Sequence, residues 1–160
     1  MSKKIYTIGH GNHHFLSFIT LIQDNNINHI IDIRSIPYSR RAPWSNKSRL
    51  SELLKAFRIR YTYLGHKLGG KQQSVQTISK QQDVTPEEIY DRAIQALIQL
   101  SERDQLTLLC AEEDPAHCHR QHILAQSLLE AGIDVIHILK DGTLKKAWKE
   151  DLPTKQPNLF

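Results

Sequence analysis

The residue types that could do chemistry in this chain gather in one stretch, residues 106–120. This stretch holds both cysteines and is the densest run of reactive side chains in the sequence. A cysteine thiolate is a nucleophile, a histidine or glutamate can carry a proton, and an arginine guanidinium binds anions. We therefore expect an enzyme site here, with Cys110, Glu112, Cys118 and His119 as catalytic candidates and Arg120 as an anion-binding candidate.

Two regular elements should position these side chains. The apolar run Leu106–Cys110 predicts a buried strand, and the apolar spacing that follows Gln121 predicts a helix that ends near Gly132. In an α/β sheet, ligands bind beyond the carboxyl end of a strand, where the start of the next helix lowers the pKa of a nearby thiol. The alternative is that both cysteines are small buried hydrophobic residues without a chemical role.

Three separated motifs resemble those of a known family. In chain order they are Tyr6–His10, Ile31–Arg40, and Leu108–Glu112 together with Ala116–Arg120. From about Ile5 to Leu139 the sequence resembles the family called domain of unknown function 488. This resemblance implies an intracellular α/β domain, found mostly in bacteria, in which the three motifs form a shared site. It implies no particular activity.

The apolar periodicity predicts alternating strands and helices. Strands are expected at residues 5–8, 29–34, 60–64, 106–110 and 134–139, and helices should begin near Phe15, Ser48, Thr85 and Gln121. Such alternation with right-handed crossovers implies parallel strands. We expect a single three-layer α/β domain over residues 1–150, with a mostly parallel five-stranded sheet flanked by helices in a Rossmann-like arrangement. Residues 151–160 would form a tail.

Two segments lack a clear period. Residues 72–85 are polar and rich in Gln and Ser, which favours either a mobile lid or a disordered excursion. Residues 144–148 form only a short amphipathic piece. The turn at Gly9–Gly11 is a weak match to a dinucleotide-binding loop, because the third small residue of that fingerprint is replaced by His14.

Polar side chains follow every predicted strand. Because the carboxyl ends of parallel strands meet at one edge of a sheet, these side chains should share one rim. The candidates there for binding a ligand or an anion are His10, Arg34, Arg40, Arg41, His66 and Arg120. Asp32 lies in an apolar run and needs a partner if it is buried, so it is either a structural acceptor or a carboxylate of the site. We favour the structural role, with Arg34 as its near neighbour.

The basic residues are unevenly distributed. The net charge of the 160 residues is +4, but the first 80 carry 13 Lys and Arg against 3 Asp and Glu, whereas the last 80 carry 8 against 14. Between Arg34 and Lys71, ten basic residues face one acid, and five aromatic residues are interleaved. This composition suits phosphate neutralisation and base stacking, so a nucleic acid or a phosphorylated small molecule is the expected partner.

Three functions fit these features. The favoured one is an enzyme acting on a nucleotide, a nucleic acid or another phosphorylated substrate. The second is a non-catalytic module that binds nucleotides or nucleic acid. The third is a metal or redox site built from Cys110, Cys118 and His119, although neither a CxxC nor an HExxH spacing is present. A cysteine-type phosphatase is disfavoured, because Ala116 stands where such a loop would place its arginine after Cys110.

The composition predicts a cytoplasmic protein. No apolar run approaches the length of about 18 residues that a membrane span needs, and the first residues do not form a secretory leader. Two cysteines eight positions apart fit a reducing compartment. We expect no membrane partner, and no motif identifies a cofactor.

Overall fold

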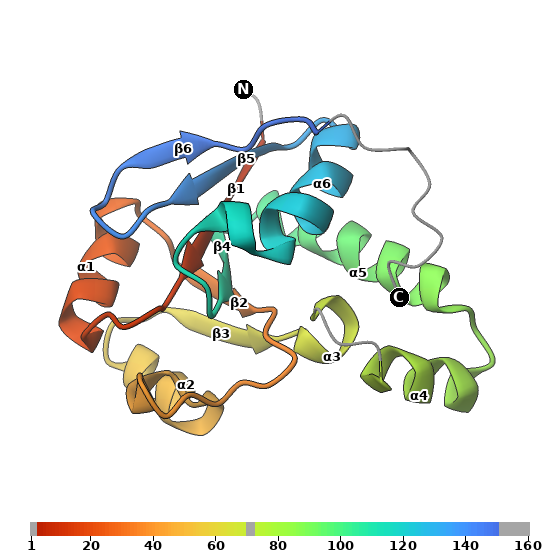
Figure 1. Ribbon diagram of the computed structural model, residues 1–160, viewed down its shortest axis with the longest axis horizontal. Helices are drawn as coiled ribbons and strands as arrows, with labels where there is room; N and C mark the ends of the chain where they lie inside the picture. The colour runs from red at the N-terminus through yellow and green to blue at the C-terminus, as the bar shows by residue number, and fades with distance from the viewer. Residues whose placement is uncertain (1–2, 70–72, 151–160) are drawn as a thin grey trace.

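A single sheet runs through the centre of the computed structural model, which describes residues 3–69 and 73–150 (Figure 1). Its strands are β1 (Lys4–Gly9), β2 (His29–Asp32), β3 (Arg60–Tyr63), β4 (Leu106–Cys110), β5 (Asp134–Ile138) and β6 (Leu144–Lys146). The α-helices are α1 (Phe15–Asp24), α2 (Lys47–Lys55), α3 (Gly65–Leu68), α4 (Gln73–Gln82), α5 (Pro86–Ser101) and α6 (Gln126–Glu130). Shorter pieces are the 3-10 helices η1 (Pro43–Ser45) and η2 (Pro115–His117) and the π-helix η3 (Arg120–Ala125). The predicted tail, residues 151–160, lies outside the described residues.

The order of the strands is β3-β2-β4-β1-β5-β6. Strands β1 to β5 are parallel to their neighbours, and β6 is antiparallel to β5. The predicted α/β class and the mostly parallel sheet are therefore confirmed, but the described sheet has six strands instead of five. A dinucleotide-binding sheet places its first strand next to its second, whereas here β4 lies between them. The Rossmann-like detail of the prediction is therefore not confirmed.

Different helices cover the two faces of the sheet (Figure 1). On one face, Phe18 of α1 and Leu50 of α2 belong to the same buried cluster as Ile8 of β1. On the other face, Leu97 of α5 belongs to a buried cluster with Ile5 of β1. Successive side chains of a strand point to opposite faces, so β1 supplies apolar side chains to both clusters. The result is three layers, with the carboxyl ends of the parallel strands left open at one edge.

Two segments differ from the expectations drawn from the sequence. Helix α4 covers most of the polar stretch 72–85, so the disordered excursion is wrong there, whereas the mobile lid stays a prediction. Gln and Lys are good helix formers even where no apolar face marks the helix. Residues 144–146 form the edge strand β6, whose three side chains are exposed and therefore leave no burial pattern in the sequence.

None of the helices within residues 3–69 and 73–150 is long and apolar enough to cross a membrane.

A buried polar network joins the central strands to the segment that follows the reactive stretch. His137 on β5 has no exposed surface; its Nδ1 accepts a hydrogen bond from the Thr7 hydroxyl at 2.6 Å, and its Nε2 donates to Gln121 Oε1 at 2.8 Å. Gln121 Nε2 donates in turn to the backbone oxygen of Trp148 at 2.8 Å. These contacts fix one neutral tautomer of the ring. Burial, assisted by the charge of Arg120, lowers the pKa of His137 to about 4.

His137 should make the protein sensitive to mild acid. Because its pKa falls from 6.5 to about 4 on folding, its neutral form stabilises the fold fully above pH 6.5, and this stabilisation is lost as the pH falls towards 4. The effect is on the order of 3 kcal/mol. We expect His137→Gln to flatten the fall in the free energy of unfolding between pH 7 and 4, measured by urea titration. The exposed His14→Gln should keep the wild-type slope, and an unchanged slope in His137→Gln would contradict the assignment.

Candidate functional site

The two cysteines of the reactive stretch lie in contact. Cys110 is the last residue of β4, and Cys118 follows η2, which begins at Pro115. The Asp114 side chain caps η2 by accepting a hydrogen bond from the Ala116 N–H at 2.9 Å. This turn brings the chain back over the strand end, so that the two Sγ atoms are 3.1 Å apart. Both are free thiols, and only 2% of Cys110 and 5% of Cys118 is exposed.

The surroundings make the two thiols chemically different. A hydrogen bond from the Cys110 thiol, the neighbouring His119 ring and the backbone N–H of Arg120 lower the pKa of Cys118 to about 4, against the opposing effect of burial. Burial and the hydrogen bond with Cys118 raise the pKa of Cys110 well above its usual value. At neutral pH, Cys118 is therefore a thiolate and Cys110 keeps its proton.

Arg120 is a buried cation whose charge acts on Cys110. It begins the π-helix η3, a type of helix that is found often at functional sites. Its side chain has no exposed surface and donates from Nη2 to the backbone oxygen of Glu113 at 2.7 Å. Its Nε and Nη1 have no hydrogen-bond partner among the residues that the structure describes. Its charge lowers the pKa of Cys110, although burial, which raises that pKa, has the larger effect.

The thiols line a small cavity of about 250 Å³. Its walls are formed by Arg34, Ser35, Ile36, Cys110, Ala111, Glu112, Cys118 and His119. The Nδ1 atom of His119 lies 3.7 Å from Cys118 Sγ, and its buried Nε2 has no partner within the described part of the chain. All four residues predicted to be catalytic therefore border one cavity.

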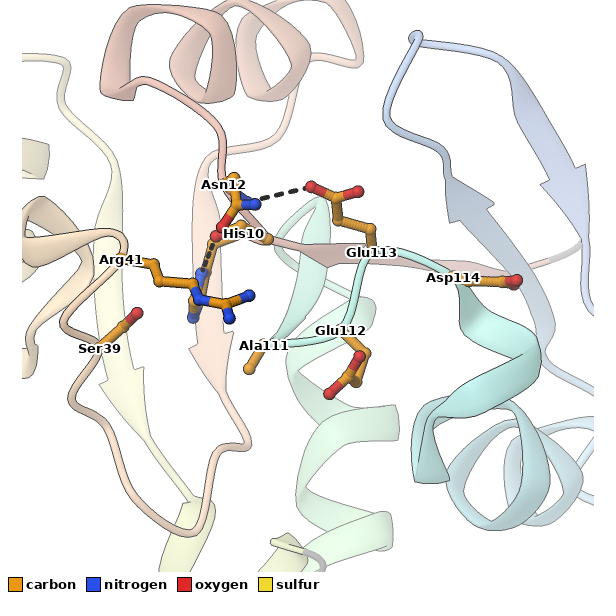
Figure 2. A pocket seen from close by; sticks show the side chains of 9 residues that line it. His10, Asn12, Ser39, Arg41, Ala111, Glu112, Glu113 and Asp114 are labelled. Carbon is orange, nitrogen blue, oxygen red and sulfur yellow. Dashed lines mark hydrogen bonds between the residues drawn. The ribbon is translucent and has the colours of Figure 1, made fainter.

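A second cavity, of about 440 Å³, adjoins the first (Figure 2). Its walls are formed by His10, Gly11, Asn12, Ser39, Arg41, Ala111, Glu112, Glu113 and Asp114. Because Ala111 and Glu112 line both cavities, this two-residue turn is their shared wall. Figure 2 shows Arg41 reaching from its loop towards the turn that carries Ala111. The predicted rim therefore brings residues of β1, β4 and the loop after β2 together.

Only some charged groups of the larger cavity are available to a ligand. Glu113 is engaged, because its Oε1 accepts a hydrogen bond from the Asn12 N–H at 3.0 Å and its Oε2 lies 3.6 Å from Lys140 Nζ. The exposed side chains of Arg41 and Glu112 form no hydrogen bond or ion pair within residues 3–69 and 73–150. A free guanidinium and a free carboxylate thus face the solvent at this site.

His10 is an unprotonated histidine in the wall of the larger cavity. Its Nδ1 lies 3.0 Å from the backbone oxygen of Gly11, which can only accept, so the proton is on Nδ1 and Nε2 keeps its lone pair. Burial lowers the pKa of His10, and Nε2 is buried without a partner among the described residues. The ring packs edge-on against Trp44. A neutral His10 is suited to accept a proton; its binding of a ligand or an anion stays a prediction.

The pairing of β1 with β4 continues beyond the strands and positions the shared wall. The backbone N–H groups of His10 and Gly11 donate to the oxygens of Cys110 and Ala111, each at 3.0 Å. Gly9 permits this close approach, because a Cβ atom there would lie 1.7 Å from the backbone oxygen of Glu112. The first motif therefore supports the third by direct contact.

Arg34 and Asp32 form the buried pair that the sequence predicts. Arg34 donates from Nε to Asp32 Oδ1 at 2.9 Å and from Nη2 to Oδ2 at 2.7 Å, and the Tyr61 hydroxyl donates to Oδ2 at 2.5 Å. Arg34 also donates to the hydroxyl of Ser45 at 3.1 Å and to its backbone oxygen at 2.6 Å. Although Arg34 borders the smaller cavity, these contacts occupy most of its donors. Its geometry is that of a residue that closes the loop after β2.

Like the buried Arg120, two other residues predicted to bind a ligand or an anion line neither cavity. Arg40 is exposed on the same loop as Arg41 but does not border either space. His66 lies on α3, where its ring stacks on Tyr63 with centroids 5.6 Å apart. The Nζ atom of Lys47 lies 4.4 Å from the centroid of the same tyrosine ring. The structure therefore places His66 in a separate aromatic and basic cluster beside β3.

Sequence reasoning missed several wall residues. Ser39 and Asn12 are common polar residues that only their position in the fold marks out. Asp114 could have been recognised, because an acid directly before Pro115 is typical of a helix cap. Within the described ranges, no group of three or more His, Cys, Asp and Glu side chains is arranged to hold a metal ion.

Comparison with known proteins points to a family. The family model described as domain of unknown function DUF488 matches residues 15–128. This range includes the second and third motifs but begins after Tyr6–His10. Neither the curated proteins nor the solved structures contain a match to the chain.

Removing the acid of the buried pair should destabilise the fold strongly. Asp32→Ala would leave the Arg34 guanidinium buried without its counter-ion, so we expect a loss of about 3–5 kcal/mol in the free energy of unfolding, measured by urea denaturation. The matched control is Glu52→Ala, which removes an exposed ion pair with Lys55 and should change stability by less than about 0.5 kcal/mol. Equal effects of the two substitutions would refute the role given to the pair.

The rate of alkylation should report the Cys118 thiolate. We expect the rate with iodoacetamide to rise with a midpoint near pH 4 and to stay constant through pH 7. Cys110→Ala removes a hydrogen-bond donor to the thiolate and should raise the midpoint by about 1–2 pH units, whereas Cys110→Ser keeps a donor and should raise it less. A wild-type midpoint near that of a free thiol, about 8.5, would contradict the assignment.

Proposed function

Because this chain belongs to the family described as domain of unknown function DUF488, whose name carries no activity, we propose its function from the geometry of the site. We propose that it is an enzyme whose nucleophile is the Cys118 thiolate and whose substrate is a nucleotide, a nucleic acid or another phosphorylated compound. One observation carries the proposal. The low-pKa thiol of Cys118 and the free guanidinium of Arg41 border two cavities that share the wall formed by Ala111 and Glu112.

In such an enzyme the two cavities would have different roles, one in binding the anionic group and one in holding the reacting atom. Arg41 would hold the anionic group in the larger cavity, where its planar guanidinium can donate two hydrogen bonds to a phosphate. The reacting atom would lie in the smaller cavity beside Cys118, which attacks it to form a covalent intermediate. His10 Nε2 and the Glu112 carboxylate are available to accept or return a proton. A thiolate of this kind fits a reducing compartment such as the cytoplasm.

Protection from alkylation tests the proposal. Inorganic phosphate and a nucleoside monophosphate should each slow the alkylation of wild-type Cys118 by iodoacetamide. Arg41→Ala should weaken this protection by about 10- to 100-fold in ligand concentration, because it removes charge-assisted hydrogen bonds. Arg40→Ala is the matched control, since its side chain lies one position away and borders neither cavity. If neither anion protects Cys118, or if the two variants behave alike, the proposal is wrong.

A second candidate is a nucleic-acid-binding module without turnover. The cluster beside β3 favours it, because Lys47 and His66 both pack on Tyr63 and so combine positive charge with aromatic surface. This function would show an affinity for single-stranded nucleic acid that falls steeply with salt and is reduced by Lys47→Ala. Cys118→Ser would leave that affinity unchanged, which separates the two candidates.

A further inference from the structure

The contact between the two thiols carries an inference beyond anion recognition. We propose that Cys118 and Cys110 form a redox pair that reduces a small hydroperoxide and ends as a Cys110–Cys118 disulfide. This inference rests on the proposed function only in using the same thiolate, and it requires neither Arg41 nor an anionic substrate. It assigns a second type of substrate, a hydroperoxide, to the smaller cavity.

The two cysteines are placed for consecutive reactions. Cys118 lies in the cavity wall beside His119, and Cys110 lies 3.1 Å from it, with its Sγ 3.4 Å from the backbone oxygen of Glu112. Both belong to the buried cluster packed against α5, and these two are the complete set of cysteines in the chain. An oxidised Cys118 would therefore meet one thiol, that of Cys110, before it could meet the thiol of another molecule.

The size and the walls of the smaller cavity suit a small, uncharged substrate. Its volume is about 250 Å³, and Ile36 and Ala111 contribute to its wall. The guanidinium of Arg34 is tied to Asp32 and Ser45, so it offers few donors to an anion. Hydrogen peroxide or a short alkyl hydroperoxide needs little space and no counter-ion.

Buried polar atoms without partners lie around the thiol pair. Arg120 is fully buried, and its Nε and Nη1 have no hydrogen-bond partner among the described residues. His119 Nε2 is likewise unpartnered there, although Nδ1 of the same ring lies 3.7 Å from Cys118 Sγ. The charge of Arg120 acts on Cys110, whose pKa it lowers against the larger effect of burial. A positive charge that acts on Cys110 favours the loss of its proton when it attacks the sulfenic acid.

The proposed reaction has two steps, oxidation of Cys118 and formation of the disulfide. The Cys118 thiolate attacks the terminal oxygen of the hydroperoxide, the O–O bond breaks, and Cys118 becomes a sulfenic acid while an alkoxide leaves and takes a proton from water. The sulfur of Cys110 then attacks the sulfur of the sulfenic acid; the S–O bond breaks, and the departing hydroxide leaves as water with the proton of the Cys110 thiol. The hydroperoxide gains two electrons and the two thiols lose them. A low-molecular-weight dithiol restores the thiols by exchange.

Treatment of the reduced, full-length protein with one equivalent of hydrogen peroxide at pH 7 tests the proposal. We expect both thiols to be lost together, with a mass decrease of two hydrogen atoms and no covalent dimer. The tryptic peptide covering residues 104–120 contains both cysteines, so it should resist iodoacetamide after oxidation and accept two labels after treatment with dithiothreitol.

Two matched variants assign the steps. In Cys110→Ser, the sulfenic acid should persist on Cys118 and be captured by a 1,3-dione probe such as dimedone. In Cys118→Ser, consumption of peroxide should fall to the rate of the buffer, because Cys110 holds its proton. Should either variant fail to fold, the peptide analysis of the wild-type protein still decides the question.

Three results would overturn the proposal: both thiols surviving one equivalent of peroxide, oxidation of Cys118 to a sulfinic acid without a disulfide, or a disulfide between two chains. Arg40→Ala, whose side chain borders neither cavity, should form the internal disulfide at the wild-type rate. Oxidation by hydrogen peroxide is measured without phosphate, and protection by phosphate is measured on the reduced protein without peroxide. Failure of the redox proposal therefore leaves the phosphate-protection result intact, and failure of the anionic-substrate proposal leaves the disulfide result intact.

Discussion

The buried pair of Asp32 and Arg34 holds the rim of the sheet in place. It forms at the end of β2. Arg34 also donates hydrogen bonds to Ser45, eleven positions later, and these bonds hold the two ends of the intervening loop together. Removing two charges from water is unfavourable unless their hydrogen bonds are satisfied, and the additional bond from Tyr61 helps to satisfy those of Asp32. The closed loop then presents Arg41 to the larger cavity.

One buried cation influences two buried groups of opposite character. The charge of Arg120 lowers the pKa of Cys110 and that of His137, in each case beside the larger effect of burial. In both cases the charge lowers a pKa, because a positive charge in a poorly solvated interior stabilises anions and repels cations. For His137 this charge adds to burial in keeping the ring neutral, whereas for Cys110 it opposes burial, which keeps the thiol protonated.

The general location of the site could be predicted from the sequence, but its contacts could not. Parallel strands must end at one edge, so polar residues at strand ends sufficed to predict that His10 and Cys110 would share a rim. The contact between Cys110 and Cys118 depends on the path of the η2 turn, which spacing alone does not reveal. Arg34 illustrates the converse limit: its type suggested anion binding and its place beside Asp32 a structural pair, and only the structure shows that Ser45 occupies further donors of Arg34.

The turn at Ala111 and Glu112 is the structural link through which a ligand in one cavity can act on the other. The turn packs against β1 at Gly9, where the absence of a side chain lets the two backbones come into contact. It also forms a wall of both cavities. An occupant of the larger cavity that displaces this partition alters the reactivity of the thiols beyond it. By reciprocity of binding free energies, a change in the charge of the thiols alters the affinity of that occupant by the same factor.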